Sequence, residues 1–219
     1  MNVLLSSYDF HESWAYEIMR PIIHQDMKVV VIPFSFDEKE VKIKEDFDNH
    51  YGRNGRHTPY IYRPFLFYGI KEEQIVFVDY FRDTINEAKI KVENADIIFL
   101  TGGLPDQYLM RLNEFGLSEI IQKNDKIVIG ASAGAMVQFD CYHITPDDDY
   151  PVYQYQDGLG LVSGFEIEVH YCHSSIQEEG IQRVIKERGL PTYTVANDGG
   201  IFVNDGKIIP FGQAFLVNK

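Results

Sequence analysis

Short apolar runs alternate with longer amphipathic stretches through roughly the first 130 residues of the chain. The run 28–34 is continuous and rich in β-branched residues, as in a strand that is covered on both faces of a parallel sheet. Runs of the same kind occupy 3–7, 74–79, 95–100 and 126–129. Apolar residues at helical spacing predict helices over 14–23, 83–93 and 106–122. This alternation predicts an α/β fold with a mostly parallel sheet and right-handed crossovers.

The other segments depart from this alternation. Residues 37–62 loosen into charged residues, asparagine, glycine and aromatics, which predicts a surface excursion. In the last third, we expect strands over 164–171 and 193–202, with a helix over 175–188 between them. The tetrad Asn204-Asp205-Gly206-Lys207 is typical of a hairpin turn. Antiparallel strands are therefore expected at one edge of the sheet.

Length and charge narrow the classes of function. A chain of 219 residues with 45% hydrophobic residues is expected to fold as one domain over 1–219. The net charge is -13 and no lysine or arginine stripe is present, which argues against a nucleic-acid partner. No window reaches the roughly 18 apolar residues of a membrane span, and Cys141 and Cys172 are too few for a disulfide framework. We expect a soluble cytoplasmic protein with reduced thiols and no membrane partner.

The segment Gly130-Ala131-Ser132-Ala133-Gly134 carries the clearest chemical signal. It follows a buried strand, opens a helix and matches the G-x-S-x-G nucleophile elbow. A serine on so sharp a turn needs neighbours without bulky side chains, and this segment supplies them. The free N–H groups at the start of the next helix favour a developing oxyanion beside Ser132. The sequence lacks the phosphate-loop patterns G-x-x-x-x-G-K-[ST] and G-x-G-x-x-G, so we predict a nucleophilic serine.

Thr101-Gly102-Gly103 ends the preceding predicted strand. Ligand-binding loops of α/β sheets lie at the carboxyl ends of strands, so this turn is expected near Ser132. The backbone N–H groups of Gly102 and Gly103, together with that of Ala133, are the predicted oxyanion hole.

These two motifs, with His170 following Ser132 by 38 residues, resemble the dipeptidase E and cyanophycinase family of serine peptidases. The resemblance extends from the strand 3–7 to the strand 196–201 and is most specific at the Ser-Ala-Gly-Ala elbow. It implies a class I glutamine amidotransferase-like fold, a three-layer α/β sandwich in which serine replaces the cysteine nucleophile of the amidotransferases.

A serine hydroxyl needs a base, and histidine is the usual one. The chain has seven histidines. The resemblance assigns the role to His170, at the end of an alternating strand, with His173 as its rival. A metal site at His170-x-x-His173 would need further ligands that the sequence does not indicate.

The sequence specifies the acidic member of the triad less well than the serine and the histidine. The resemblance selects Asp149, two residues before Pro151, as the third member of the triad. Asp157 and Glu168 remain alternatives. A run of three adjacent aspartates is also typical of a solvated turn.

Together these features predict a serine-type peptidase that cleaves a small peptide or amide through an acyl-enzyme on Ser132, without a metal or organic cofactor. The segment after His170 is poor in basic residues, so a preference for N-terminal aspartate is not implied. Arg183 is the candidate substrate contact, and its alternative role is that of an exposed helix residue. An esterase of the α/β-hydrolase type and a non-catalytic binding protein on the same fold are the alternatives. The sequence leaves open whether the protein forms a homodimer.

Overall fold

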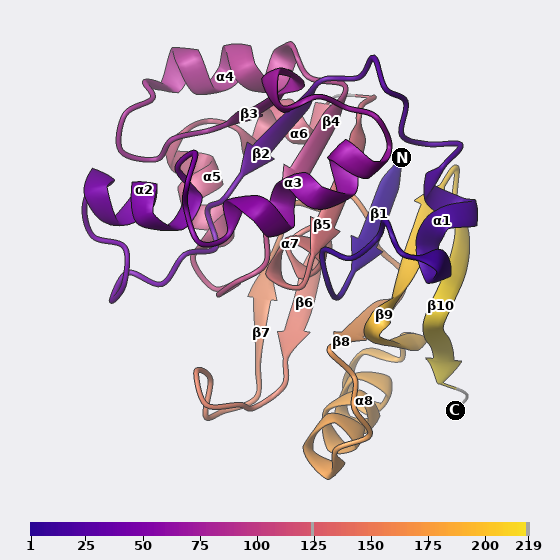
Figure 1. Cartoon of the computed structure of the whole chain (residues 1–219). Coiled ribbons are helices and arrows are strands. Elements are labelled where there is room, and N and C mark those ends of the chain that lie inside the picture. The colour runs from indigo at the N-terminus through magenta and orange to yellow at the C-terminus, as the bar shows by residue number, and fades with distance from the viewer. Residues whose placement is uncertain (124, 218–219) are drawn as a thin grey trace.

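An eight-stranded sheet forms the centre of the computed structural model, which describes residues 1–123 and 125–217 (Figure 1). Its order is β10-β9-β1-β5-β4-β2-β3, with β8 paired to one end of β9. The strands are β1 (Asn2–Leu5), β2 (Val29–Ile32), β3 (Ile75–Phe77), β4 (Ile97–Leu100), β5 (Ile127–Ala131), β8 (Glu166–Val169), β9 (Thr192–Asn204) and β10 (Lys207–Val217). Neighbouring strands in the part β1-β5-β4-β2-β3 are parallel to one another. Strand β9 is antiparallel to both β1 and β10. The predicted α/β class and the antiparallel edge are confirmed.

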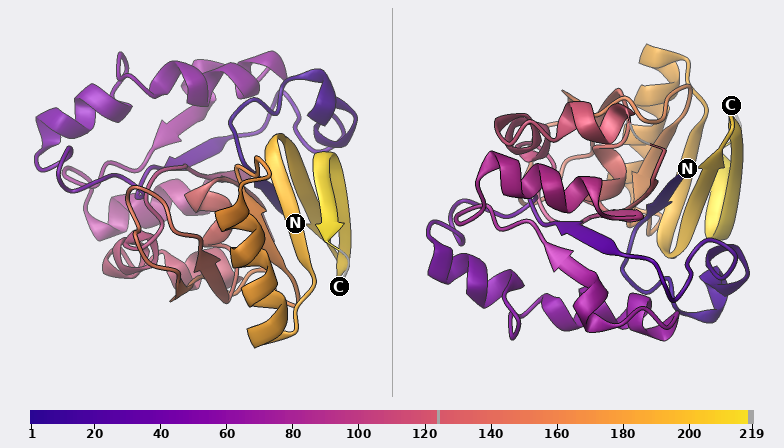
Figure 2. Two further views of the ribbon diagram at one scale, coloured as in Figure 1. Left: turned by 90° about the horizontal axis from the view of Figure 1, so that it is seen from below. Right: turned by 90° about the horizontal axis from the view of Figure 1, so that it is seen from above.

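Helices cover both faces of this sheet (Figure 2). They are α1 (Ser13–Met19), α2 (Lys44–Tyr51), α3 (Thr58–Phe67), α4 (Ile85–Glu93), α5 (Tyr108–Glu114), α6 (Ser118–Lys123), α7 (Ala133–Met136) and α8 (Ser175–Arg188). Alternate strand residues point to opposite faces, so Val29 and Val31 of β2 enter one core and Val30 and Ile32 the other. The first core packs against α1, α2 and α3, and the second against α4, α5 and α6. Within the described ranges, no helix combines the length and apolar composition that a membrane crossing requires.

Two expectations about helices need correction. The helix predicted over 106–122 is divided into α5 and α6, because Gly116 adopts φ 61° and its N–H donates to Asn113 O instead of continuing the helix. The predicted surface excursion over 37–62 contains α2 and the start of α3. Phe47 and Tyr51 of α2 are buried in the first core, so their packing overrides the polar composition of the segment.

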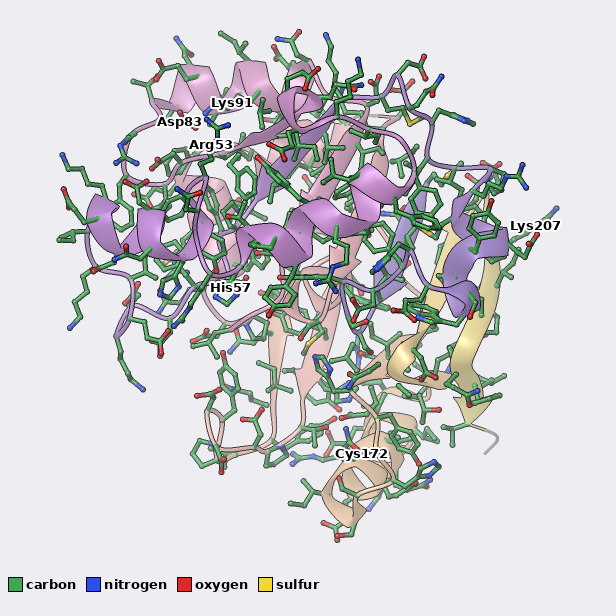
Figure 3. All side chains as sticks on the ribbon, viewed as in Figure 1. Arg53, His57, Asp83, Lys91, Cys172 and Lys207 are labelled. Atoms are coloured by element: carbon green, nitrogen blue, oxygen red, sulfur yellow. The ribbon has the colours of Figure 1, made fainter. Side chains whose placement is uncertain are left out.

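Ion pairs also stabilise the positions of α2 and α4. Arg82 pairs with Asp48 of α2 at 2.6 Å and with Asp79, just after β3, at 2.7 Å. Lys91 of α4 pairs with Asp83 at the top of the molecule (Figure 3). These contacts connect α2 and α4 to the loop that follows β3.

A separate two-stranded hairpin was not expected from the sequence. It consists of β6 (Cys141–Ile144) and β7 (Gln154–Asp157), which pair antiparallel below the main sheet in Figure 1. The aspartate-rich segment 147–149 belongs to the loop that joins these two strands.

The long strand β9 determines where the functional groups meet. Its first part pairs in parallel with β8, with Val195 opposite Val169, and its later part pairs with β1, with Gly200 opposite Leu5. The residues between these two pairings therefore lie beside the ends of both β8 and β1. The carboxyl ends of β1, β4 and β5 open at the same edge.

Candidate active site

Ser132 lies on a strained turn between β5 and α7. Its φ and ψ are 52° and -117°, a conformation that non-glycine residues rarely adopt. A Cβ on Gly130 would lie 2.0 Å from Gly134 O, and one on Gly134 would lie 2.1 Å from Leu100 O, so both positions require glycine. The N–H of Ser132 donates to Leu5 O at 2.8 Å. The structure thus confirms the sharp strand-to-helix turn expected from the sequence.

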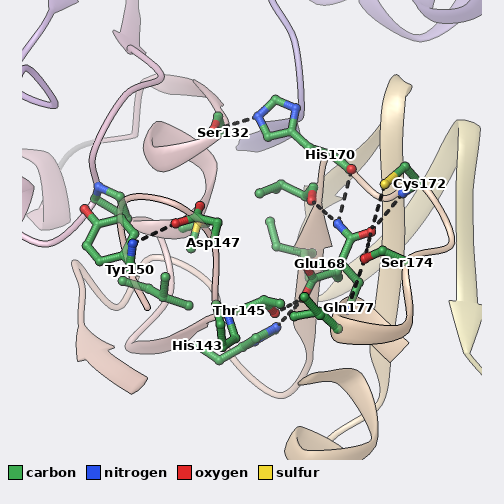
Figure 4. A pocket seen from close by; sticks show the side chains of 17 residues that line it. Ser132, His143, Thr145, Asp147, Tyr150, Glu168, His170, Cys172, Ser174 and Gln177 are labelled. Carbon is green, nitrogen blue, oxygen red and sulfur yellow. Dashed lines mark hydrogen bonds and ion pairs between the residues drawn. The ribbon is translucent and has the colours of Figure 1, made fainter. Parts of the chain in front are cut away.

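His170 faces this serine. Its Nε2 lies 2.9 Å from Ser132 Oγ (Figure 4). The residue directly follows β8 and has φ 52°, which turns it out of the strand. Its N–H donates to Ser6 Oγ at 3.1 Å, and that hydroxyl donates to Val195 O at 2.7 Å. The backbone of the histidine is therefore held from both β1 and β9.

The group behind the imidazole is an amide. Asn197 Oδ1 lies 2.7 Å from His170 Nδ1. A carboxamide oxygen can only accept, so Nδ1 carries the proton and Nε2 is left to accept from the Ser132 hydroxyl. The side chain of Ser7 donates to Asn197 O at 2.7 Å, which fixes this part of β9. Ser132, His170 and Asn197 form a continuous hydrogen-bonded chain.

The structure does not bring Asp149 to His170. Both ring nitrogens of the histidine are occupied by Ser132 and Asn197. Asp149 is exposed in the β6–β7 loop, where Asp147 Oδ1 accepts its N–H at 2.9 Å, so the aspartates form a solvated turn.

The other two candidate acids are also elsewhere. Asp157 pairs with Cys141 in the hairpin, and Glu168 contacts His143 at 2.8 Å. His173 packs against Tyr171, with ring centroids 4.6 Å apart. Across the residues that the structure describes, no group of three or more His, Cys, Asp or Glu side chains is placed to hold a metal ion.

The glycine turn after β4 supplies one free N–H rather than two. Gly102 N–H donates to Tyr8 Oη at 2.7 Å. This N–H is therefore not free to bind an oxyanion, contrary to the expectation. Gly102 instead allows the turn to pack closely against Ser132. Its Cβ position lies only 3.2 Å from Ser132 Cβ. In the described part of the chain, neither Gly103 N–H nor Ala133 N–H has a protein acceptor. These two groups are the remaining oxyanion candidates.

Three consecutive residues after β1 organise the site, and sequence reasoning did not single them out. Ser6 binds the backbone of His170, Ser7 binds that of Asn197, and Tyr8 binds that of Gly102. Desolvation raises the pKa of the Tyr8 phenol, so its hydroxyl stays protonated. Their position at the carboxyl end of a parallel strand was the available signal. Asn197 had no comparable signal, because it lies inside a strand.

A pocket of about 320 Å³ opens beside Ser132 and His170 (Figure 4). Its lining combines aliphatic side chains with a few polar ones: Pro105, Ser132, Met136, His143, Ile144, Thr145, Pro146, Asp147, Tyr150, Ile167, Glu168, Val169, His170, Cys172, Ser174, Ile176 and Gln177. Arg183, the candidate substrate contact, is not among them. Its Nε donates to Glu187 at 2.8 Å and its guanidinium lies over Tyr153, because α8 directs this side chain away from the pocket.

An α/β fold with a serine on a nucleophile elbow and a histidine at hydrogen-bond distance defines a hydrolase-type site. The model of Peptidase family S51 matches residues 51–210, which include Ser132, His170 and Asn197. The chain belongs to this family and is a serine peptidase. The resemblance drawn from the sequence motifs is thereby confirmed.

Two solved structures share the fold. A putative peptidase E protein from Listeria monocytogenes EGD-e is similar with a TM-score of 0.68 and 22% identity, over 95% of this chain and 96% of that one. A peptidase from an acI-B1 actinobacterium gives a TM-score of 0.59 and 16% identity, over 97% of this chain and 87% of that one. At these identities the likeness establishes the fold. No curated protein matches the chain.

Proposed function

We propose that the protein hydrolyses a small peptide or amide through an acyl-enzyme on Ser132. The observation that carries this proposal is the 2.9 Å contact between His170 Nε2 and Ser132 Oγ. A binding protein with an idle elbow would not need this contact, nor the amide that holds the imidazole tautomer. The pocket volume of about 320 Å³ suits a short substrate rather than a folded chain.

The first half of the reaction forms an ester. Ser132 Oγ attacks the carbonyl carbon of the scissile bond while its proton passes to His170 Nε2. The negative charge that develops on the carbonyl oxygen is stabilised by the N–H groups of Gly103 and Ala133. His170 then returns the proton to the leaving nitrogen, and the C–N bond breaks.

The second half repeats these steps with water. His170 Nε2 accepts a proton from the water molecule, whose oxygen attacks the ester carbonyl. The proton then returns to Ser132 Oγ as the acid product leaves. Asn197 keeps the imidazole in one orientation throughout, although its neutral amide stabilises the imidazolium less than a carboxylate does. These steps need no metal or organic cofactor.

Labelling with a fluorophosphonate probe tests the nucleophile. We expect the probe to add to Ser132, with the modified peptide identified by mass spectrometry, and Ser132→Ala to lose the label. Ser163→Ala is a matched control, because Ser163 is exposed and outside the pocket. Labelling that persists in Ser132→Ala, or that maps to another residue, would contradict the proposed mechanism.

A further inference from the structure

Glu168 is a buried carboxylate on the wall of the pocket. Its side chain belongs to β8, two residues before His170, and the residue is only 5% exposed. The Oε2 atom accepts from Thr145 Oγ1 at 2.7 Å and lies 2.8 Å from His143 Nε2. No donor within the described ranges reaches the other oxygen, Oε1. Glu168 lines the same pocket as Ser132, so its Oε1 is available to accept a hydrogen bond from a ligand in that pocket.

The residues behind Glu168 do not make the pocket positive. His143 lies between Glu166 and Glu168, at 3.2 Å and 2.8 Å, and Arg188 pairs with Glu166. Two carboxylates and one arginine leave this cluster with one negative charge when His143 is neutral, and with none when His143 is protonated on both nitrogens. The cluster is thus neutral or negative in either state of the histidine.

A second carboxylate faces Glu168 across the pocket. Asp147 stands on the opposite side in Figure 4. Its Oδ1 accepts the N–H groups of Asp149 and Tyr150, at 2.9 and 2.7 Å, and its Oδ2 accepts from none of the residues described. The pocket lining contains no lysine or arginine, so its formal charge is negative. Such a pocket repels an acidic side chain and attracts a cation.

We propose that this pocket holds the basic side chain, lysine or arginine, of the residue whose carbonyl Ser132 attacks. The inference rests on the proposed function. Glu168 is two residues before His170 in the chain, so their Cα atoms lie about 7 Å apart. Lysine presents its ammonium at the end of a four-carbon stem, so it reaches farther from the scissile carbonyl than a free α-amino group does.

The aliphatic wall fits the same ligand. Ile144, Ile167 and Val169 line the pocket together with Met136, and they offer an apolar surface to the stem of the side chain. The charged head then meets Glu168 Oε1, with which it forms a charge-assisted hydrogen bond. The pocket therefore discriminates by charge at its far end and by apolar contact along its length.

Binding of matched amides tests this proposal without catalysis. The Ser132→Ala protein is titrated calorimetrically with lysinamide and with norleucinamide, which has the same stem without the ammonium, and with argininamide and citrullinamide. We expect each cationic amide to bind at least about tenfold more tightly than its neutral partner. Equal affinities within either pair of amides would overturn the proposal. This comparison needs no change at Glu168, so it decides the matter even where a substitution there lowers stability.

A substitution then locates the effect. In the Ser132→Ala background, Glu168→Gln should bring lysinamide to the affinity of norleucinamide, while Asp149→Asn, an equal charge change at an exposed residue, should leave the difference intact. A Glu168→Gln protein that keeps its melting temperature and still prefers lysinamide overturns the assignment to Glu168. So does a protein in which affinity for both amides falls equally, because that is the result of a structural role.

Hydrolysis separates failure of the inference from failure of the proposed function. With Ser132 present, lysine and arginine p-nitroanilides should be cleaved with kcat/KM at least about tenfold above the leucine and aspartate compounds. Cleavage of all four at similar rates, with Ser132 labelled by a fluorophosphonate, would overturn only the substrate class. Absence of both labelling and cleavage would contradict the proposed function, and the amide titration would still decide whether the pocket prefers a cation.

Discussion

His170 Nδ1 lies 2.7 Å from Asn197 Oδ1, so the proposed base is oriented by a neutral amide rather than by a carboxylate. The amide selects the tautomer in which Nε2 accepts the proton of Ser132. It adds no negative charge beside the imidazole, so the proposed mechanism assigns more of the transition-state stabilisation to the oxyanion donors and the pocket.

The contribution of Asn197 can be separated into orientation and charge. We expect Asn197→Ala to lower kcat/KM about 10- to 100-fold, because the imidazole loses the acceptor that fixes its tautomer. We expect Asn197→Asp to retain activity and to move the acid limb of the kcat/KM profile to higher pH, because a carboxylate favours the protonated imidazole, which cannot act as a base. Both are measured from initial rates between pH 5 and 9. An Asn197→Ala protein with unchanged activity would show that this contact is not part of the mechanism.

Gly103 is expected to tolerate no side chain. Its φ is 143°, and a Cβ there would lie 2.3 Å from Ser35 O. Gly103→Ala should therefore displace the turn that carries an oxyanion donor and lower kcat/KM by at least about 100-fold. Gly164→Ala is a control, because Gly164 also has a positive φ, 84°, but nothing lies within 4 Å of its Cβ position. Comparable activity losses in the two variants, measured with melting temperatures, would argue against a specific role for Gly103.

Arg111 should matter for the stability of the fold. The side chain is 1% exposed, and its Nη1 donates to Phe34 O at 2.7 Å and Phe36 O at 2.8 Å. Ser35, between these two residues, is the contact of Gly103. Arg111→Met leaves two carbonyls without a donor and should lower the free energy of unfolding by about 2–5 kcal/mol, measured by urea denaturation.

The matched control for this change is Arg183→Met, because Arg183 is exposed, forms an ion pair with Glu187 on the same helix and lies over the ring of Tyr153. Its cost should stay below about 0.5 kcal/mol. If Arg111→Met loses no more stability than this control, the hydrogen bonds of Arg111 to the backbone of residues 34–36 do not contribute as predicted.

Two histidines of the helical layer predict a pH dependence of stability. Burial, and then the charge of Arg56, lower the pKa of both His50 and His57. The unfolded chain therefore binds more protons than the folded one once the pH falls below about 6.5, and the free energy of unfolding decreases from pH 7 toward pH 5. His57→Gln should flatten this decrease in urea titrations, whereas His24→Gln, at an exposed position, should not. A slope that His57→Gln leaves unchanged would contradict the prediction.

Local steric and electronic demands explain why part of the site could be predicted from the sequence. Gly130 and Gly134 are needed because a Cβ at either position meets backbone atoms, and that demand is visible in the order of residues around Ser132. His170 was found because it ends an alternating strand at a position that the family motif shares. The helix expected over 175–188 has the observed bounds, and Ser174 and Gly189, which cap its two ends, are local features of the sequence.

The errors share a different physical origin. Asp149 was selected from its spacing to Ser132 and Pro151, but a hairpin that the sequence did not reveal carries it to an exposed loop. Asn197 reaches His170 only because β9 pairs in parallel with β8. Tyr8 meets Gly102 across 94 positions of the chain for a similar reason, since their strands end at the same edge of the sheet.

By itself the sequence determined the α/β class, the elbow at Ser132, the glycine turn before it and the choice of His170, because each depends on neighbours along the chain. Only the tertiary structure decided that Asn197 stands behind the imidazole, that Tyr8 occupies the N–H of Gly102, and that the pocket is acidic at Glu168. These contacts join strands distant in sequence. Their partners are selected by strand pairing and packing, which no local pattern of residues specifies.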